Sequence, residues 1–159
     1  MLHFWSRIPE KNYAVTPYIA EYHNTWSNAG FLLLGIWGVL QAQWSLASEH
    51  HRALALKLYL LMIGCGIGSV IHHAIASKYY WRTIGADYVC IVLSILTIWT
   101  NAGVILPLMS LETQLWISFA CGIFVLDHVW SGLRAPWGHV IWHLSSAWAM
   151  YCLGWDILC

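Results

Sequence analysis

Five long apolar runs constrain the fold of this 159-residue chain more than any other feature. Each run is close to the ~20 residues that an α-helix needs to cross ~30 Å of hydrocarbon. The connections between the runs are short, and no repeat or linker divides the chain. We therefore predict a single all-α transmembrane domain over residues 1–159, a bundle of about five membrane-spanning helices. The polar N-terminal segment covers residues 1–23, and the runs cover residues 26–46, 53–76, 83–106 (closed by Pro107), 111–130 and 137–153.

The composition supports a multi-pass integral membrane protein in contact with the lipid bilayer. Hydrophobic residues make up 60% of the chain and charged residues only 9%, whereas soluble domains carry about 25% charged residues. The seven basic and seven acidic residues give a formal net charge of zero, which argues against a nucleic-acid partner. The five cysteines are scattered without a CxxC pair, so neither a disulfide framework nor a cysteine-rich metal site is indicated.

Five crossings would place most of the ionisable residues near the membrane side on which the N-terminus lies. The second run ends on that side, the third begins there, the fourth ends there and the fifth begins there. The residues concerned are His72, His73, Asp87, Asp127, His128, His139 and His143. Five of the seven Lys and Arg residues fall on the same side, which the positive-inside rule assigns to the cytoplasm.

Three histidines in this group predict a metal site. His139 and His143 are four residues apart, so on a helix their rings share one face. With His73 they would supply three nitrogen ligands and leave one tetrahedral position for water, the pattern of a catalytic zinc site. Asp87 could then hold the water or transfer its proton, and Ser69 could hydrogen-bond a developing oxyanion.

Other interpretations of these residues remain open at this stage. A histidine inside a membrane bundle can simply hydrogen-bond to a neighbouring helix, and two histidines on facing helices can hold a haem. A Ser–His hydrolase is a third alternative, but the GxSG context of its nucleophile is absent, because Gly68-Ser69 continues as Val70-Ile71.

Several motifs together resemble those of the alkaline ceramidases. Residues 10–28, EKNYAVTPYIAEYHNTWSN, are similar to the N-terminal signature of that family. Gly68-Ser69-x-x-His72-His73 resembles its G-S-x-x-F-H motif, and His139-x-x-Trp142-His143 resembles its terminal H-x-x-W-H motif. Residues 124–127, FVLD, resemble the segment that precedes the terminal motif. This family belongs to a superfamily of membrane zinc hydrolases that also includes adiponectin-receptor-like proteins.

The resemblance implies a membrane enzyme that cleaves the N-acyl amide of ceramide-like lipids to a sphingoid base and a free fatty acid. It implies Zn²⁺ held by His73, His139 and His143, with Ser69 and an aspartate, Asp87 here, completing the site. It also implies a Ca²⁺ site in the N-terminal segment, whose oxygen ligands would be Glu10, Asn12 and Glu21. An ester-cleaving phospholipase of the same superfamily and a non-hydrolytic metal or haem membrane protein are the alternatives.

The chain departs from the family pattern in three ways. The family has seven helices where this chain has room for five, so a homo-oligomer is one way to complete the lipid pocket. Arg7-Ile8 replaces the Asp-Trp of the family, which predicts weakened or lost Ca²⁺ binding. The interval from His73 to Asp87 is a few residues longer than in the family, and an extended loop over SKYYWR (residues 77–82) would absorb the difference.

Overall fold

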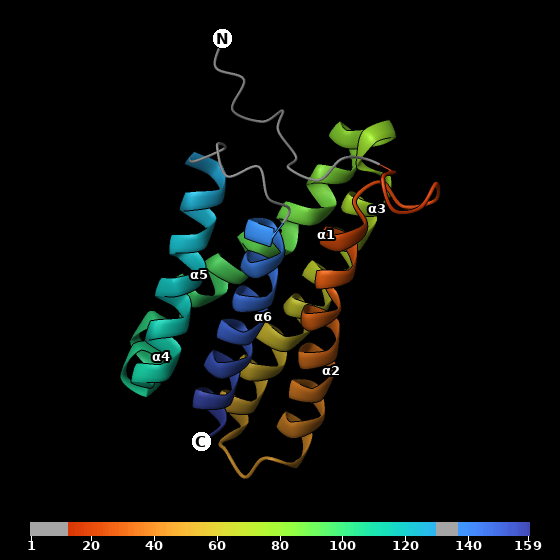
Figure 1. Ribbon diagram of the computed structural model, residues 1–159. Coiled ribbons are helices and arrows are strands. Elements are labelled where there is room, and N and C mark those ends of the chain that lie inside the picture. The colour runs from red at the N-terminus through yellow and green to blue at the C-terminus, as the bar shows by residue number, and fades with distance from the viewer. Residues whose placement is uncertain (1–12, 130–136) are drawn as a thin grey trace.

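The computed structural model describes residues 13–129 and 137–159, with the backbone only at residues 76–82, 84, 87, 128 and 129 (Figure 1). The described residues form helices and no strand, as the sequence predicts. The helices are α1 (Tyr22–Ser27), α2 (Ala29–Trp44), α3 (Glu49–Thr100), α4 (Ala102–Leu108), α5 (Leu111–Val129) and α6 (Trp137–Leu158).

Helix α3 contains both the second and the third predicted runs, and the expected loop between them is helical. It does not run straight, however. His72 Nδ1 lies 3.0 Å from Thr83 Oγ1, although eleven residues of straight helix would span about 16 Å. We call residues 49–75 its first limb and residues 88–100 its second limb; Figure 1 shows the second limb turning back from the end of the first. The polar stretch SKYYWR suggested a loop, but it contains neither Pro nor Gly, so the helical hydrogen bonding continues through the bend.

The two limbs of α3 pack against each other. A Cβ atom on Gly64 in the first limb would lie 2.8 Å from the Sγ atom of Cys90 in the second. This close approach is possible because glycine has no side chain. The limbs therefore form one wall of the bundle together.

The third predicted run is interrupted at Asn101 rather than closed by Pro107. Asn101 leaves the helical region (φ −114°, ψ 18°), and its Nδ2 donates to the Thr97 carbonyl at 2.8 Å. Such a side-chain bond offers the backbone an alternative to regular helix. The axes of Tyr88–Thr100 and Ala102–Leu108 consequently differ by 84°, and Pro107 lies inside the short helix α4.

The predicted count of five membrane spans is not confirmed by the described helices. Glu49–Ile75 alone is long and apolar enough to cross a membrane, with a mean hydropathy of 2.0. The bent pair Tyr88–Thr100 and Ala102–Leu108 meets the same criterion jointly, so the described part of the chain has one such span, or two. Helix α2 has only 16 residues, and α6 includes two histidines and four tryptophans, which lower its hydropathy.

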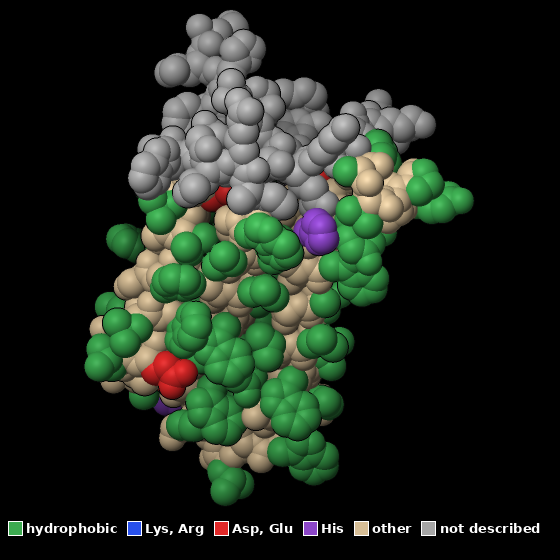
Figure 2. Space-filling model, viewed as in Figure 1, with side chains coloured by type: hydrophobic (Ala, Val, Ile, Leu, Met, Phe, Trp, Pro, Cys, Tyr) green, Lys and Arg blue, Asp and Glu red, His purple; other side chains and the backbone are tan. Residues whose placement is uncertain are grey.

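The outer surface is nevertheless largely apolar. Figure 2 shows hydrophobic side chains over most of the described part of the visible face. Over the described residues as a whole, Leu33 on α2 is 68% exposed and Trp99 on α3 is 79% exposed. An exposed apolar surface of this extent is typical of proteins whose surface contacts a membrane or another protein.

Helix α6 is central, because it packs against α2, α3 and α5. Tyr59 of α3 joins three of these helices: its ring is fully buried and lies directly against Gly38 of α2 and Gly154 of α6. Its hydroxyl donates to the Tyr151 carbonyl at 3.3 Å. This packing fixes the end of α6 that lies away from His139 and His143.

Candidate metal centre

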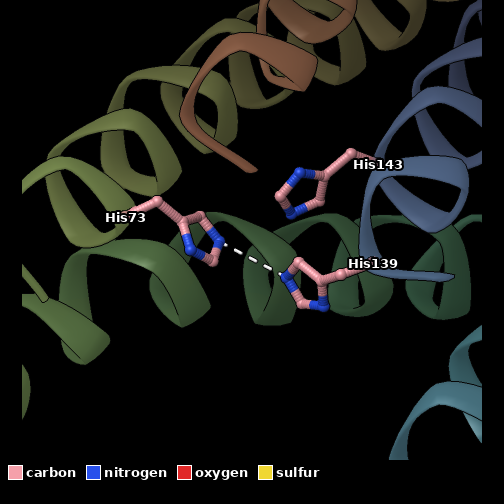
Figure 3. Close-up of side chains that lie close together, drawn as sticks. All are labelled: His73, His139 and His143. Atoms are coloured by element: carbon pink, nitrogen blue, oxygen red, sulfur yellow. Dashed lines mark hydrogen bonds between the residues drawn. The ribbon is translucent and has the colours of Figure 1, made fainter. Parts of the chain in front are cut away.

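Three elements bring the predicted histidine ligands together at one end of the bundle. His73 lies near the end of the first limb of α3, His139 and His143 lie in the first two turns of α6, and α1 packs against both helices. One ring nitrogen from each histidine lies within 4.8 Å of the others. Figure 3 shows the three rings converging from two helices. The structure therefore brings the three predicted histidines together at one end of the bundle.

Two of the rings are held by carboxylates. His73 Nδ1 donates to Glu21 Oε2 at 2.7 Å, and His139 Nδ1 donates to Asp127 Oδ2 at 2.9 Å. Because an ionised carboxylate can only accept a hydrogen bond, the proton of each neutral ring is on Nδ1. The lone pair of each ring is therefore on Nε2, the atom that faces the other histidines.

The third ring is held in the same way by a hydroxyl group. His143 Nδ1 lies 2.7 Å from Ser27 Oγ, and Ser27 Oγ donates its own proton to the Asn24 carbonyl at 2.9 Å. The serine oxygen must then accept from His143 Nδ1, which again leaves the lone pair on Nε2. His143 is almost fully buried, and its Nε2 has no hydrogen-bond partner among the described groups.

This arrangement fits a zinc ion. The Nε2 atoms of His73 and His139 are 3.4 Å apart (dashed line in Figure 3). Two nitrogens that each lie about 2.0–2.1 Å from one zinc at the tetrahedral angle would be separated by about 3.3–3.4 Å. Without a cation between them, two lone pairs would face each other in a buried place. Metal-bound histidines also characteristically donate their second ring N–H to a carboxylate or another oxygen, as all three do here.

Ser69 lies one helical turn before His73 and is 2% exposed. Its Oγ has no hydrogen-bond partner in the described part of the chain. Ser69 and His143 both line a cavity of about 470 Å³ whose other walls are mainly apolar. The hydroxyl is therefore available to a group bound between the histidines and this cavity.

Glu21, predicted from the resemblance as a calcium ligand, is part of the histidine cluster. Its carboxylate is fully buried and accepts from both His73 Nδ1 and, at 2.9 Å, Asn24 Nδ2. Burial raises the pKa of the Glu21 carboxyl, and the hydrogen bond from Asn24 opposes that rise. A cation at His73 would favour the ionised carboxylate further.

The remaining predicted site residues cannot be placed. Glu10 and Asn12 lie outside the described residues, and only the backbone of Asp87 is described. The calcium site and the role of Asp87 stay predictions. Conversely, the sequence did not predict that Glu21, Asp127 and Ser27 orient the histidines. Only Asp127 gave a signal for this role, because the sequence predicts it on the same membrane side as the three histidines.

The family of this protein follows from a match to a protein-family model. The family model described as Ceramidase matches residues 8–126, about three quarters of the sequence. The chain belongs to the ceramidase family. This membership implies a membrane-associated hydrolase that acts on amides and has a lipid, ceramide, as its substrate. Neither the search of curated proteins nor the search of solved structures found a match.

The matched region includes only part of the histidine cluster. Glu21, Ser69 and His73 lie inside it, whereas Asp127 and both histidines of α6 lie beyond its end. The inclusion of His139 and His143 in the site therefore rests on their geometry and on the H-x-x-W-H motif. The structure places both next to His73, which lies inside the matched region and is at least 66 residues away from them in the sequence.

Proposed function

We propose that this protein is an intramembrane zinc-dependent ceramidase, which cleaves the N-acyl amide of ceramide-like lipids to a sphingoid base and a free fatty acid. The observation that carries the proposal is the convergence of one ring nitrogen from each of three histidines, with the Nδ1 of each ring held by a separate oxygen. These hydrogen bonds leave the lone pair of each ring on Nε2, and the Nε2 atoms of His73 and His139 face each other at 3.4 Å, which supports a cation between them.

His73, His139 and His143 would hold the metal. Bound there, zinc supplies a water whose pKa is about 7 and a positive charge that polarises a carbonyl group. Glu21, Asp127 and Ser27 keep the three rings in the tautomer that such binding needs. The apolar cavity beside His143 excludes bulk water from the reacting groups.

Ser69 and Asp87 would complete the chemistry. The free hydroxyl of Ser69 donates to the amide oxygen as negative charge develops on it. Asp87, assigned from the family resemblance, takes a proton from the attacking water and returns it to the leaving nitrogen. The water oxygen bonds to the acyl carbon, the C–N bond breaks, and the products are a carboxylic acid and an amine.

The geometry favours a metal ion over haem, one of the alternatives left open by the sequence. Haem uses two axial histidines on opposite faces of a flat macrocycle, whereas here three nitrogens lie within 4.8 Å of one another. An ester-cleaving lipid hydrolase would use the same residues, so the amide must be tested against an ester.

We further propose a multi-pass protein with the histidines at its cytoplasmic end, because five of seven basic residues fall on that side of the predicted topology.

The test is metal analysis combined with hydrolysis by the full-length protein in detergent micelles. We expect about one zinc ion per chain, and faster hydrolysis of a ceramide than of an ester with the same two chains. The His143→Ala variant should lose both zinc and activity. His50→Ala is the control, because His50 is exposed at the start of α3, far along the chain from the cluster, and should retain both.

Two results would overturn the proposal. One is a zinc-loaded protein that hydrolyses neither the amide nor the ester. The other is a His143→Ala variant that keeps its zinc, because the converging Nε2 atoms would then not be the metal ligands.

A further inference from the structure

One residue of α1, Asn24, is bonded to the groups that hold two of the three histidines. Its side-chain Nδ2 donates to Glu21 Oε2 at 2.9 Å, and the same oxygen accepts from His73 Nδ1 at 2.7 Å. Its main-chain carbonyl accepts from Ser27 Oγ at 2.9 Å, and that hydroxyl holds His143 Nδ1 at 2.7 Å. Because His73 and His143 lie on different helices, Asn24 connects two sides of the histidine cluster.

We infer that Asn24 is a positioning residue of the metal centre, whose amide fixes the carboxylate of Glu21 and thereby the ring of His73. This inference rests on the proposed function in one respect, because it takes the three histidines as metal ligands. It adds a residue that acts on the metal only through Glu21.

The main chain of Glu21 is already fixed by α3, so only its side chain remains to be oriented. Ala20 N donates to the Ala74 carbonyl at 2.9 Å, and Glu21 N donates to the His73 carbonyl at 3.1 Å. The last side-chain torsion of a glutamate is intrinsically broad, so a bond to one ring leaves the carboxylate room to rotate. A second donor to the same oxygen restricts that rotation, as supporting hydrogen bonds do in functional sites.

An asparagine suits this position because its amide donates a hydrogen bond without adding charge. Asn24 and Glu21 are both 0% exposed and lie one turn apart at the start of α1. A carboxylate can only accept, so Nδ2 is the atom of Asn24 that faces it. An aliphatic side chain at position 24 would leave Glu21 Oε2 with His73 as its single donor. An aspartate there would place two carboxylates next to each other, which is unfavourable.

A second asparagine at this end of the bundle has a different role. Asn28 is also 0% exposed, and its Nδ2 donates to the Asn24 carbonyl at 2.8 Å. This bond stabilises the main chain where α1 meets α2. The amide of Asn24, in contrast, is bonded to a side chain that holds a histidine, so the two residues should respond differently to the removal of Glu21.

A double-mutant cycle on zinc affinity tests the inference. The full-length protein in detergent micelles is titrated with zinc against a competing chelator. Asn24→Ala should weaken zinc binding about tenfold, the lower limit for groups that orient metal ligands. In the Glu21→Ala background the same substitution should weaken it by less than about twofold, because the carboxylate that Asn24 orients is gone.

Two further variants separate the hydrogen bond from packing. Leucine branches like asparagine and fills the space but cannot donate, so Asn24→Leu should lose as much zinc affinity as Asn24→Ala. Asn28→Ala is the matched control, since it makes the same change at an equally buried position. Any effect of Asn28→Ala on zinc affinity should be the same with and without Glu21.

A readout that needs no metal is the tautomer of His73 in the zinc-free protein. Nitrogen NMR of the imidazole rings distinguishes a proton on Nδ1 from a proton on Nε2, and the His73 signals are identified by their loss in His73→Ala. In the unsubstituted protein the proton should be on Nδ1, where Glu21 accepts it. Asn24→Ala should raise the share of the other tautomer, because the accepting oxygen is no longer held in place.

The outcomes separate this inference from the proposed function. Equal losses of zinc affinity for Asn24→Ala with and without Glu21, or an unweakened affinity in Asn24→Leu, overturn the inference even if ceramide is hydrolysed. An unchanged His73 tautomer in Asn24→Ala overturns it as well. A coupled loss of affinity together with a shifted tautomer supports it, even if the purified protein hydrolyses no ceramide. If the chain binds no zinc, the proposed function fails and the tautomer alone decides the inference.

Discussion

The two ends of the helix bundle are stabilised by different kinds of interaction. At the histidine end, buried polar groups predominate: Glu21, Asn24 and Asn28 are all 0% exposed and are joined by hydrogen bonds to one another and, through Glu21, to His73. At the other end, Tyr59 is equally buried, but its surroundings are mainly glycines, aliphatic side chains and the ring of Tyr151. Helices α3 and α6 contribute to both ends, so the same two helices support chemistry at one end and close packing at the other.

The difference lies in what holds each end together. Around Tyr59 packing contacts predominate, and the hydrogen bond from its hydroxyl to the Tyr151 carbonyl is a single directional contact among them. Around the histidines the contacts are hydrogen bonds between distant parts of the chain: Ser27 to His143 across 116 residues and Glu21 to His73 across 52. A lost partner there leaves a buried polar atom unsatisfied. Substitutions at the histidine end should therefore change metal binding and activity, and substitutions at the Tyr59 end should change stability alone.

The largest effect among substitutions that spare the metal ligands should come from Ser69→Ala. Removing one donor to a developing oxyanion typically lowers kcat by about 10²–10³-fold. Zinc content should stay at the wild-type value, because Ser69 lies next to the ligands and is not one of them. Steady-state hydrolysis of ceramide and metal analysis of the same sample measure both quantities.

A buried serine with another role provides the control for this substitution. Ser145 is also buried, but its hydroxyl donates to the Trp142 carbonyl at 3.2 Å, so Ser145→Ala should retain kcat. If S69A keeps wild-type kcat, or loses zinc along with activity, Ser69 does not act on the substrate oxygen.

The next largest effect should come from the carboxylates behind the ligands. Replacing such partners typically weakens metal affinity by about 10–100-fold. For Glu21→Ala we expect a loss of zinc affinity near the upper limit of this range. The Glu21–His73 pair is almost fully buried, because the Glu21 side chain is 0% exposed and the His73 side chain 4%. For Asp127→Ala we expect a loss of zinc affinity near the lower limit. The Asp127 side chain is 11% exposed, so water can replace it beside His139.

Zinc affinities measured against a competing chelator test this order. Glu21→Gln should recover most of the loss, because its amide oxygen can still accept from His73 Nδ1. Equal losses for Glu21→Ala and Asp127→Ala would show that burial of the pair does not set its contribution to metal binding.

The two regions also differ in how far the sequence predicted them. The spacing of His139 and His143 and the order of the apolar runs were enough to place three histidines on one side and to predict their convergence. The hydrogen-bond partners Ser27, Glu21 and Asp127 could not be predicted in this role. Bonds between residues so far apart in sequence leave no periodic pattern, and Glu21 was interpreted instead as a calcium ligand.

The helix boundaries were predicted less well than the helical character. Hydropathy separates residues 53–76 from 83–106 because the stretch between them is polar, but polarity does not prevent a helix from continuing. Conversely, Asn101 interrupts an apolar run because its side chain bonds to the Thr97 carbonyl, a local effect that hydropathy does not detect. The close packing of Tyr59 against Gly38 and Gly154 depends on how three helices cross, which no single segment encodes.

The smallest effect on the site should come from Gly154→Ala at the Tyr59 end. A Cβ atom there would overlap the Tyr59 ring, which is buried and cannot move freely. Overpacking of this kind costs about 1–3 kcal/mol in the free energy of unfolding. We expect a lower Tm in thermal unfolding with unchanged zinc affinity. Gly122→Ala on α5 is the control, because nothing lies within 4 Å of its Cβ position, and it should not lower the Tm. If G154A weakens zinc binding as strongly as Glu21→Ala does, the two ends are coupled through α6 and the separation between chemistry and packing is wrong.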